Sequence, residues 1–263
     1  MLLIHQLSFY LHIAIGSCAL MVFWIPVFTR KGNLDHKRFG RYFASAMYIV
    51  AASGFLMSSL DLLFPLSMHA DGIQMTLAEE REAIAEIRSF AIFLFSLSIL
   101  VFTSTRQGWL AIQVKEDRQA LRTPVHTFLC LALVLVGISL FVTGIIYQSV
   151  LFMVFSVLQV VIGLSNLRYN FKTEHKPKQW WIEHLRGLIG SGIGAYTAFF
   201  VFGGRRIFDS IFSGAFADAS LILWVAPGVI GGIAIAWLSR HYESRFSGEW
   251  AIKRARSRVA LLK

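Results

Sequence analysis

The chain has 263 residues, of which 56% are hydrophobic and only 15% are charged. About a quarter of the residues in a soluble domain are charged, so this composition excludes a protein that covers itself with polar surface and indicates a bilayer as its solvent. The formal net charge of +10 does not indicate a nucleic-acid partner, because the cytoplasmic loops of membrane proteins collect lysine and arginine for topological reasons.

Seven apolar segments follow one another along the chain, and a run of about 18 or more apolar residues is typical of a spanning helix. The fourth and fifth segments are separated only at about Gln148. Together they are too long for one span, so we expect a helical hairpin there. No glycine-rich or serine-rich linker divides the chain, so we predict an all-α bundle of seven transmembrane helices in a single domain, residues 1–263. The segments cover residues 6–29, 41–66, 89–105, 124–147, 149–167, 185–204 and 219–240.

Lysine and arginine alternate between the loops of this bundle. If the N-terminus lies outside, the first, third and fifth loops and the C-terminal tail hold 21 of the 25 lysine and arginine residues. Only Arg81, Arg88, Arg205 and Arg206 fall on the other side. Because positively charged loops stay in the cytoplasm, the pattern predicts an outside N-terminus, an inside C-terminus and an odd number of spans. We expect the protein in the bacterial inner (plasma) membrane.

Two stretches outside the apolar segments have a composition of their own. Residues 74–88 alternate apolar and acidic side chains at helical spacing, which predicts a short amphipathic helix on the outer side. The tail, about 241–263, is basic with apolar residues between its charges, so we expect it to lie against anionic lipid on the inner face.

The sixth apolar segment carries small residues at intervals of four, which lets helices approach closely. Gly187, Ser191 and Ala195 form one such series, and Gly190 and Gly194 form a second. The pattern places this segment at the centre of the bundle, either for packing alone or to make room for a flat cofactor or a substrate.

Three histidines are expected near the inner face, each leading into a different helix: His36, His126 and His184. Imidazole is a ligand for zinc, copper and iron, including haem iron, so we predict a site there for a transition metal or haem b. Glu174 and Glu183 are candidates to orient the rings through hydrogen bonds. The alternative is that these histidines lie among lipid headgroups, because no HxxxH, CxxC or HExxH spacing occurs.

Two arginines beside His36 extend this prediction. Arg38 and Arg41 can pair with haem propionates or with lipid phosphates through bidentate contacts. Orientation of the protein in the membrane explains the same charges equally well.

A second polar group is expected in the outer leaflet. His12 lies deep in the first segment, His5 shares its helical face, and Asp61 is the only carboxylate inside a predicted span. Tyr196 is expected near the level of His12. These side chains form either a proton relay or hydrogen bonds that hold helices together.

In LHIAIG, His12 and Gly16 stand four residues apart in the first segment, and a basic loop follows that segment. These stretches resemble a bacterial family of predicted integral membrane proteins of unknown function, whose members have a helix that starts His-x-x-x-Gly and then a basic loop with His-Arg-x-x-Gly-Arg-x-Tyr. Here that loop reads HKRFGRY from His36, with one inserted residue. WIEHLRGLIGSGIGAYTAFFV is similar to a later family segment, in which a histidine, here His184, precedes a small-residue helix ending in Thr-Ala-Phe. The resemblance covers about half of the chain. It implies a membrane location and marks His12, His36 and His184, but it implies no reaction.

We therefore expect a multi-pass membrane protein with a metal-binding or haem-binding, redox-active role near the cytoplasmic face. One alternative is a transporter of a small molecule, an ion or protons, which the polar side chains His12, Asp61, Gln159, Tyr196 and Thr197 in otherwise apolar helices would favour. Another is a non-catalytic membrane partner or sensor subunit. The sequence does not decide whether the protein is an enzyme.

Overall fold

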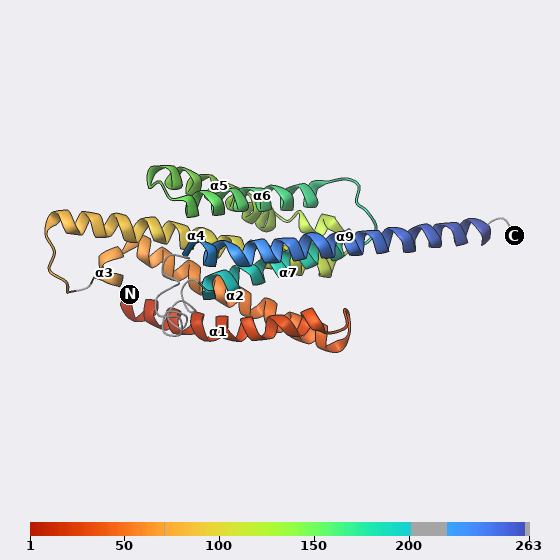
Figure 1. Ribbon diagram of the computed structural model, residues 1–263, viewed down its shortest axis with the longest axis horizontal. Coiled ribbons are helices and arrows are strands. Elements are labelled where there is room, and N and C mark those ends of the chain that lie inside the picture. Colours follow the sequence, from red (N-terminus) through yellow and green to blue (C-terminus); the bar gives the residue numbers. More distant parts are fainter. Residues whose placement is uncertain (71, 201–219, 261–263) are drawn as a thin grey trace.

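The computed structural model describes residues 1–70, 72–200 and 220–260, and within these ranges every regular element is helical. The helices run up and down in turn, so that each long helix is antiparallel to the one before it (Figure 1). The helices are α1 (Leu2–Phe28), α2 (Leu34–Leu63), α3 (Pro65–His69), α4 (Leu77–Val114), the 3₁₀ helix η1 (Arg118–Leu121), α5 (Pro124–Ile146), α6 (Val150–Phe171), α7 (Gln179–Ala198) and α9 (Ser220–Ala260).

Helix starts coincide with side chains that can bind the first free backbone N–H groups. Asn33 caps α2 by accepting from His36 N, and Thr123 and Ser149 cap α5 and α6 in the same way. Thr76 and Glu79 form a reciprocal capping box at the start of α4. The predicted hairpin between the fourth and fifth segments is confirmed, since only residues 147–149 separate α5 from α6 and Gln148 adopts φ 50°.

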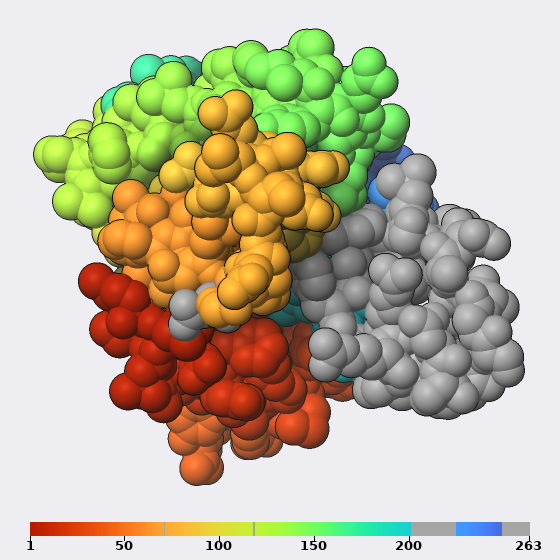
Figure 2. Space-filling model, turned by 90° about the vertical axis from the view of Figure 1, so that its left-hand side faces the viewer, coloured from red at the N-terminus to blue at the C-terminus, as the bar shows by residue number. Residues whose placement is uncertain are grey.

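α4 is the central helix of the bundle, because it packs against α2, α5 and α7. The α5–α6 hairpin forms one edge, and the α1–α2 pair forms the opposite edge (Figure 1). We call the end that holds the N-terminus and α3 the N-end, and the opposite end, where α9 projects, the tail end. Seen from the N-end, the start of α1 lies beside the segment that joins α2 to α4 (Figure 2).

Five of the helices are long and apolar enough to cross a bilayer, namely α1, α2, α4, α5 and α6. Their outward faces are apolar: Leu135 and Ile146 on α5 and Val161 on α6 are 66%, 70% and 58% exposed. Polar side chains such as Gln107 and Gln159 are buried between the helices instead. This arrangement is what a protein dissolved in lipid requires. Seven spans and their orientation remain predictions.

Two predicted boundaries differ from the structure. Residues 77–88 do not form a separate amphipathic helix, because α4 runs without a break from Leu77 to Val114. The stretch carries no proline or glycine that would end a helix before the apolar part begins. Likewise, α9 continues from the seventh segment through residues 241–260 of the predicted tail. Residues 201–204 of the sixth segment and residue 219 of the seventh lie outside the described part of the chain.

Candidate functional site

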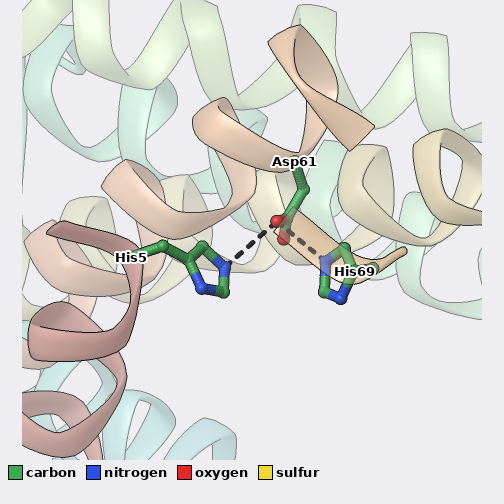
Figure 3. A group of neighbouring side chains, drawn as sticks. All are labelled: His5, Asp61 and His69. Carbon is green, nitrogen blue, oxygen red and sulfur yellow. Dashed lines mark hydrogen bonds and ion pairs between the residues drawn. The ribbon is translucent and has the colours of Figure 1, made fainter. Parts of the chain in front are cut away.

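Asp61 is a buried carboxylate in the last turn of α2, at the N-end of the bundle, and its side chain is only 8% exposed. Two imidazoles from other helices point at it from opposite sides (Figure 3). His5 Nε2 lies 3.0 Å from Asp61 Oδ1, and His69 Nε2 lies 2.9 Å from the same oxygen. α1, α2 and α3 therefore each contribute one side chain to this cluster, which we call the outer triad.

The path of the chain after Asp61 explains how His69 comes back to it. Helix α2 ends at Leu63, and Phe64 adopts a non-helical conformation with φ −133° and ψ 55°. Pro65 then starts the one-turn helix α3, where its missing N–H costs nothing. His69 is the last residue of α3, which places its ring against the carboxylate eight residues earlier.

The outer triad brings together side chains of the types that bind transition metals. One nitrogen from each histidine and one carboxylate oxygen lie within 4.8 Å of one another. Ligand atoms around a tetrahedral zinc ion are about 3.3 Å apart, so small side-chain movements would accommodate an ion. Two histidines with one carboxylate suit zinc or ferrous iron, and they leave coordination positions open. The His69 side chain is 44% exposed, so the open side faces out of the bundle.

Without a metal, the same atoms form hydrogen bonds in which each imidazole N–H donates to the carboxylate, or ion pairs when the histidines are protonated. These contacts join α1, α2 and α3 at the N-end. The geometry therefore offers a structural role and a metal-binding role, and the two compete for the same nitrogen atoms.

Nearer the tail end than the outer triad, a second polar layer joins α1 to α2. His12 Nδ1 lies 2.9 Å from Ser53 Oγ, and Ser53 Oγ donates to Ile49 O. A Cβ atom on Gly54 would come within 3.5 Å of the His12 ring and 2.7 Å of Ser98 Oγ, so His12 packs closely against α2, and α2 in turn packs closely against α4. His12 thus bonds Ser53 of the neighbouring helix and contacts neither Asp61 nor Tyr196 through a hydrogen bond.

Tyr196 lies nearer the tail end than the sequence suggested. Its hydroxyl group donates to Leu20 O and accepts from Trp24 Nε1, which joins α7 to the second half of α1. Leu20 is two turns beyond His12, so Tyr196 and His12 belong to different layers of the bundle.

At the tail end, His36 and His184 lie side by side, with ring centroids 6.5 Å apart. His36 Nδ1 is 3.0 Å from Pro26 O, and His184 Nδ1 is 2.9 Å from Gly108 O. A carbonyl accepts only, so each Nδ1 carries a proton, and in the neutral ring each Nε2 then keeps a lone pair. Histidine ligands of metals show this pattern of hydrogen bonding.

Lys31 is part of the same region. Its ammonium group donates to Pro26 O and Val27 O, two carbonyls at the end of α1 that the helix leaves free. Burial lowers the pKa of Lys31. His36 and Lys31 therefore also close the C-terminal turn of α1, which is a structural reason for both residues.

His126 takes part in a separate network and does not join His36 and His184. Its Nε2 lies 2.6 Å from Gln107 Oε1, and Gln107 Nε2 donates to Glu183 Oε1 at 3.0 Å. Glu183, predicted to orient a metal ligand, thus bonds an amide. Within the described ranges, the only group of three or more metal-ligating side chains is the outer triad.

The two arginines beside His36 face away from this network. Arg38 Nε donates to Tyr42 OH at 3.1 Å, and the guanidinium lies over the Tyr42 ring. Arg38 and Arg41 are both exposed, at the depth expected for lipid headgroups. Their pairing with haem propionates or lipid phosphates stays a prediction.

Comparisons of this chain with protein-family models, with curated proteins and with solved structures found no match. The resemblance to a bacterial membrane-protein family therefore stays a prediction. The candidate sites rest on their geometry alone.

Proposed function

We propose that this chain is a multi-pass protein of the bacterial inner membrane that binds a divalent transition metal, with zinc as the first choice, through the outer triad. The observation that carries the proposal is that His5 of α1 and His69 of α3 both meet one buried carboxylate oxygen of Asp61 on α2. The distribution of lysine and arginine supports placing this end outside the membrane.

The composition of the outer triad supports a transition metal over calcium or magnesium. Calcium and magnesium take oxygen ligands, whereas two of the three atoms here are imidazole nitrogens. Three protein ligands with an open side are typical of zinc that holds a water molecule or exchanges with solvent. A structural zinc site has four protein ligands and no open position.

The experiment is zinc titration of the detergent-purified, metal-stripped protein by calorimetry, with elemental analysis of the protein as isolated. We expect one zinc ion per chain. The variants His69→Ala and Asp61→Asn should bind it at least about tenfold more weakly, because each removes one ligand. His241→Ala is the matched control, since it removes an exposed histidine of α9 and should leave zinc binding unchanged.

Two outcomes would contradict the proposal. One is a protein that binds no zinc. The other is zinc binding that survives both triad variants. Thermal unfolding of each variant without metal separates loss of a ligand from loss of the fold.

A second candidate is a metal or haem site at the tail end, formed by His36 and His184. Two imidazoles that share one metal ion have ring centres roughly 5 to 6.5 Å apart, and the 6.5 Å between these rings agrees with that range. Both Nδ1–H groups bond carbonyls, which aims the Nε2 lone pairs away from the backbone. The same samples test this site: a Soret band, or metal lost in a His36→Ala/His184→Ala variant, would support it.

A further inference from the structure

A line of buried polar side chains runs between α4 and α6, which are parallel to each other (Figure 1). On α4 the residues are Ser96, Thr103 and Gln107, and on α6 they follow with the same intervals of seven and four. All six are at most 6% exposed. We call this set the polar seam: Ser96, Thr103 and Gln107 with Gln159, Asn166 and Asn170.

The members of the polar seam pair in register. Gln159 Nε2 donates to Ser96 Oγ at 2.9 Å, and Gln107 Nε2 donates to Asn170 Oδ1 at 3.0 Å. The partners are 63 positions apart in both pairs, and the same offset relates Thr103 to Asn166. A repeated offset along two parallel helices identifies one continuous polar face and not three isolated contacts.

The pairing nevertheless leaves several buried atoms without a protein partner. Thr103 Oγ1, Asn166 Nδ2 and Gln159 Oε1 are such atoms, and so is His126 Nδ1 next to Gln107. A buried polar group without a partner destabilises the folded protein. Water molecules that bridge buried polar groups remove this cost and are a regular part of protein structure.

The two ends of the polar seam differ. Towards the tail end it meets His126, which lies inside a predicted span, and Glu183, which lies in α7 just before the sixth predicted span. Arg122 Nε donates to Asn170 O beside the loop. Towards the N-end it is closed. Phe93, Leu140, Phe152 and Phe155 form a buried apolar cluster one turn beyond Ser96 and Gln159, which we call the phenylalanine plug.

We propose that the polar seam holds a file of water molecules that opens at the tail end and stops at the phenylalanine plug. It gives water, and the protons that water carries, access from the inner side to the centre of the membrane. Ionisable groups within spans usually mark such paths. The unpaired atoms are its binding sites for water, and His126 and Glu183 are the groups that exchange protons with it. This inference is independent of the outer triad.

The first test uses the unmodified protein in detergent. Radiolytic hydroxyl-radical labelling with mass spectrometry modifies side chains that touch water, including water inside a protein. His126 and Met47 are both fully buried, but Met47 lies in an apolar cluster with Ala19 and Phe43. We expect modification of His126 at a rate at least about tenfold above that of Met47, although methionine is the more easily oxidised side chain.

The second test finds the side of access. In a Cys18→Ser/Cys130→Ser background, Thr103→Cys and Ser96→Cys each place one thiol in the polar seam, and Val161→Cys places one on the lipid-facing side of α6. A small, charged thiol reagent should label Thr103→Cys at least about tenfold faster than Val161→Cys, because only hydrated thiols form the reactive thiolate. Labelling should occur from the inner side of oriented vesicles and not from the outer side.

A dry seam would overturn the proposal. It would appear as an unmodified His126, together with seam thiols that react no faster than the Val161→Cys thiol until the protein is denatured. Equal labelling from both sides would also overturn it, since the phenylalanine plug could then not be the end of the path.

Discussion

The absence of one methyl group sets how closely α4 and α7 approach. A Cβ atom on Gly187 would lie 2.5 Å from the Cα and N atoms of Gly108 and 2.7 Å from Ser104 O. These are backbone atoms, which cannot rotate away. His184 bonds Gly108 O one turn earlier on α7, so this crossing also positions the histidine pair at the tail end.

Substitution of Gly187 tests this contact. Gly187→Ala should destabilise the protein by about 1–3 kcal/mol, because overpacking forces the two backbones apart. The measurement is the thermal unfolding midpoint in detergent. Gly190→Ala is the control on the same helix: its Cβ would meet nothing within 4 Å, and alanine favours a helix over glycine, so the midpoint should stay or rise. Equal midpoints for both variants would show that the crossing is adaptable.

Some residues of the candidate sites can be predicted from the sequence and others cannot. Asp61 was predicted because a carboxylate within an apolar span is costly and so conspicuous. His69 was missed, since it lies outside the apolar segments. The available signal was the Phe64–Pro65 break right after Asp61, which ends α2 and turns the chain back. Depth alone predicts a site of His36, His126 and His184. The structure brings His36 and His184 together, whereas depth cannot tell that His126 of α5 bonds Gln107 of α4 instead.

The lengths of the apolar segments predict which helices exist and in what order better than they predict the residues at which those helices begin and end. Each of the seven apolar segments corresponds to one long helix of the described structure. The ends differ where a polar helix continues an apolar one, as in α4 and α9, because hydropathy changes at the membrane surface while helix propensity does not. The polar seam went unpredicted, since its register between α4 and α6 depends on their parallel packing.

The phenylalanine plug, where α4 packs against α6, predicts that losing one ring would open the water path. Phe93→Ala removes the fully buried ring that α4 contributes, against Phe152 and Phe155 of α6. If apolar side chains close the water path, vesicles containing this variant should leak protons at least about tenfold faster than wild type, because hydrophobic constrictions block conduction by excluding water. The measurement is a pH-sensitive dye inside vesicles under an imposed potential.

Phe128→Ala serves as the control for that leak. It removes the same side chain from α5, but from a position that is 67% exposed, so no leak is expected. A Phe93→Ala variant that leaks no protons and keeps normal thermal stability would show that other side chains close the water path.

Lysine and arginine are distributed unevenly among the loops of the protein, and this distribution predicts its orientation in the membrane. Ile73, in the loop between α3 and α4, should lie outside, and Glu174, between α6 and α7, should lie inside. Both are exposed. In the background without native cysteines, Ile73→Cys in intact cells should react with an impermeant thiol reagent, whereas Glu174→Cys should react only after permeabilisation. The opposite result would invert the orientation and place the outer triad in the cytoplasm.

α4 is far longer than a bilayer needs. Its 38 residues extend about 57 Å, against a hydrocarbon core of about 30 Å. In Figure 1 it projects at the N-end past α1 and α2. The consequence is mechanical. A ligand or partner that pulls on the projecting turns, near Leu77, acts on an unbroken helix that carries Phe93 and then Ser96 about four to five turns further along. Displacement outside the membrane would thus be transmitted, without any hinge, to the side chains at its centre.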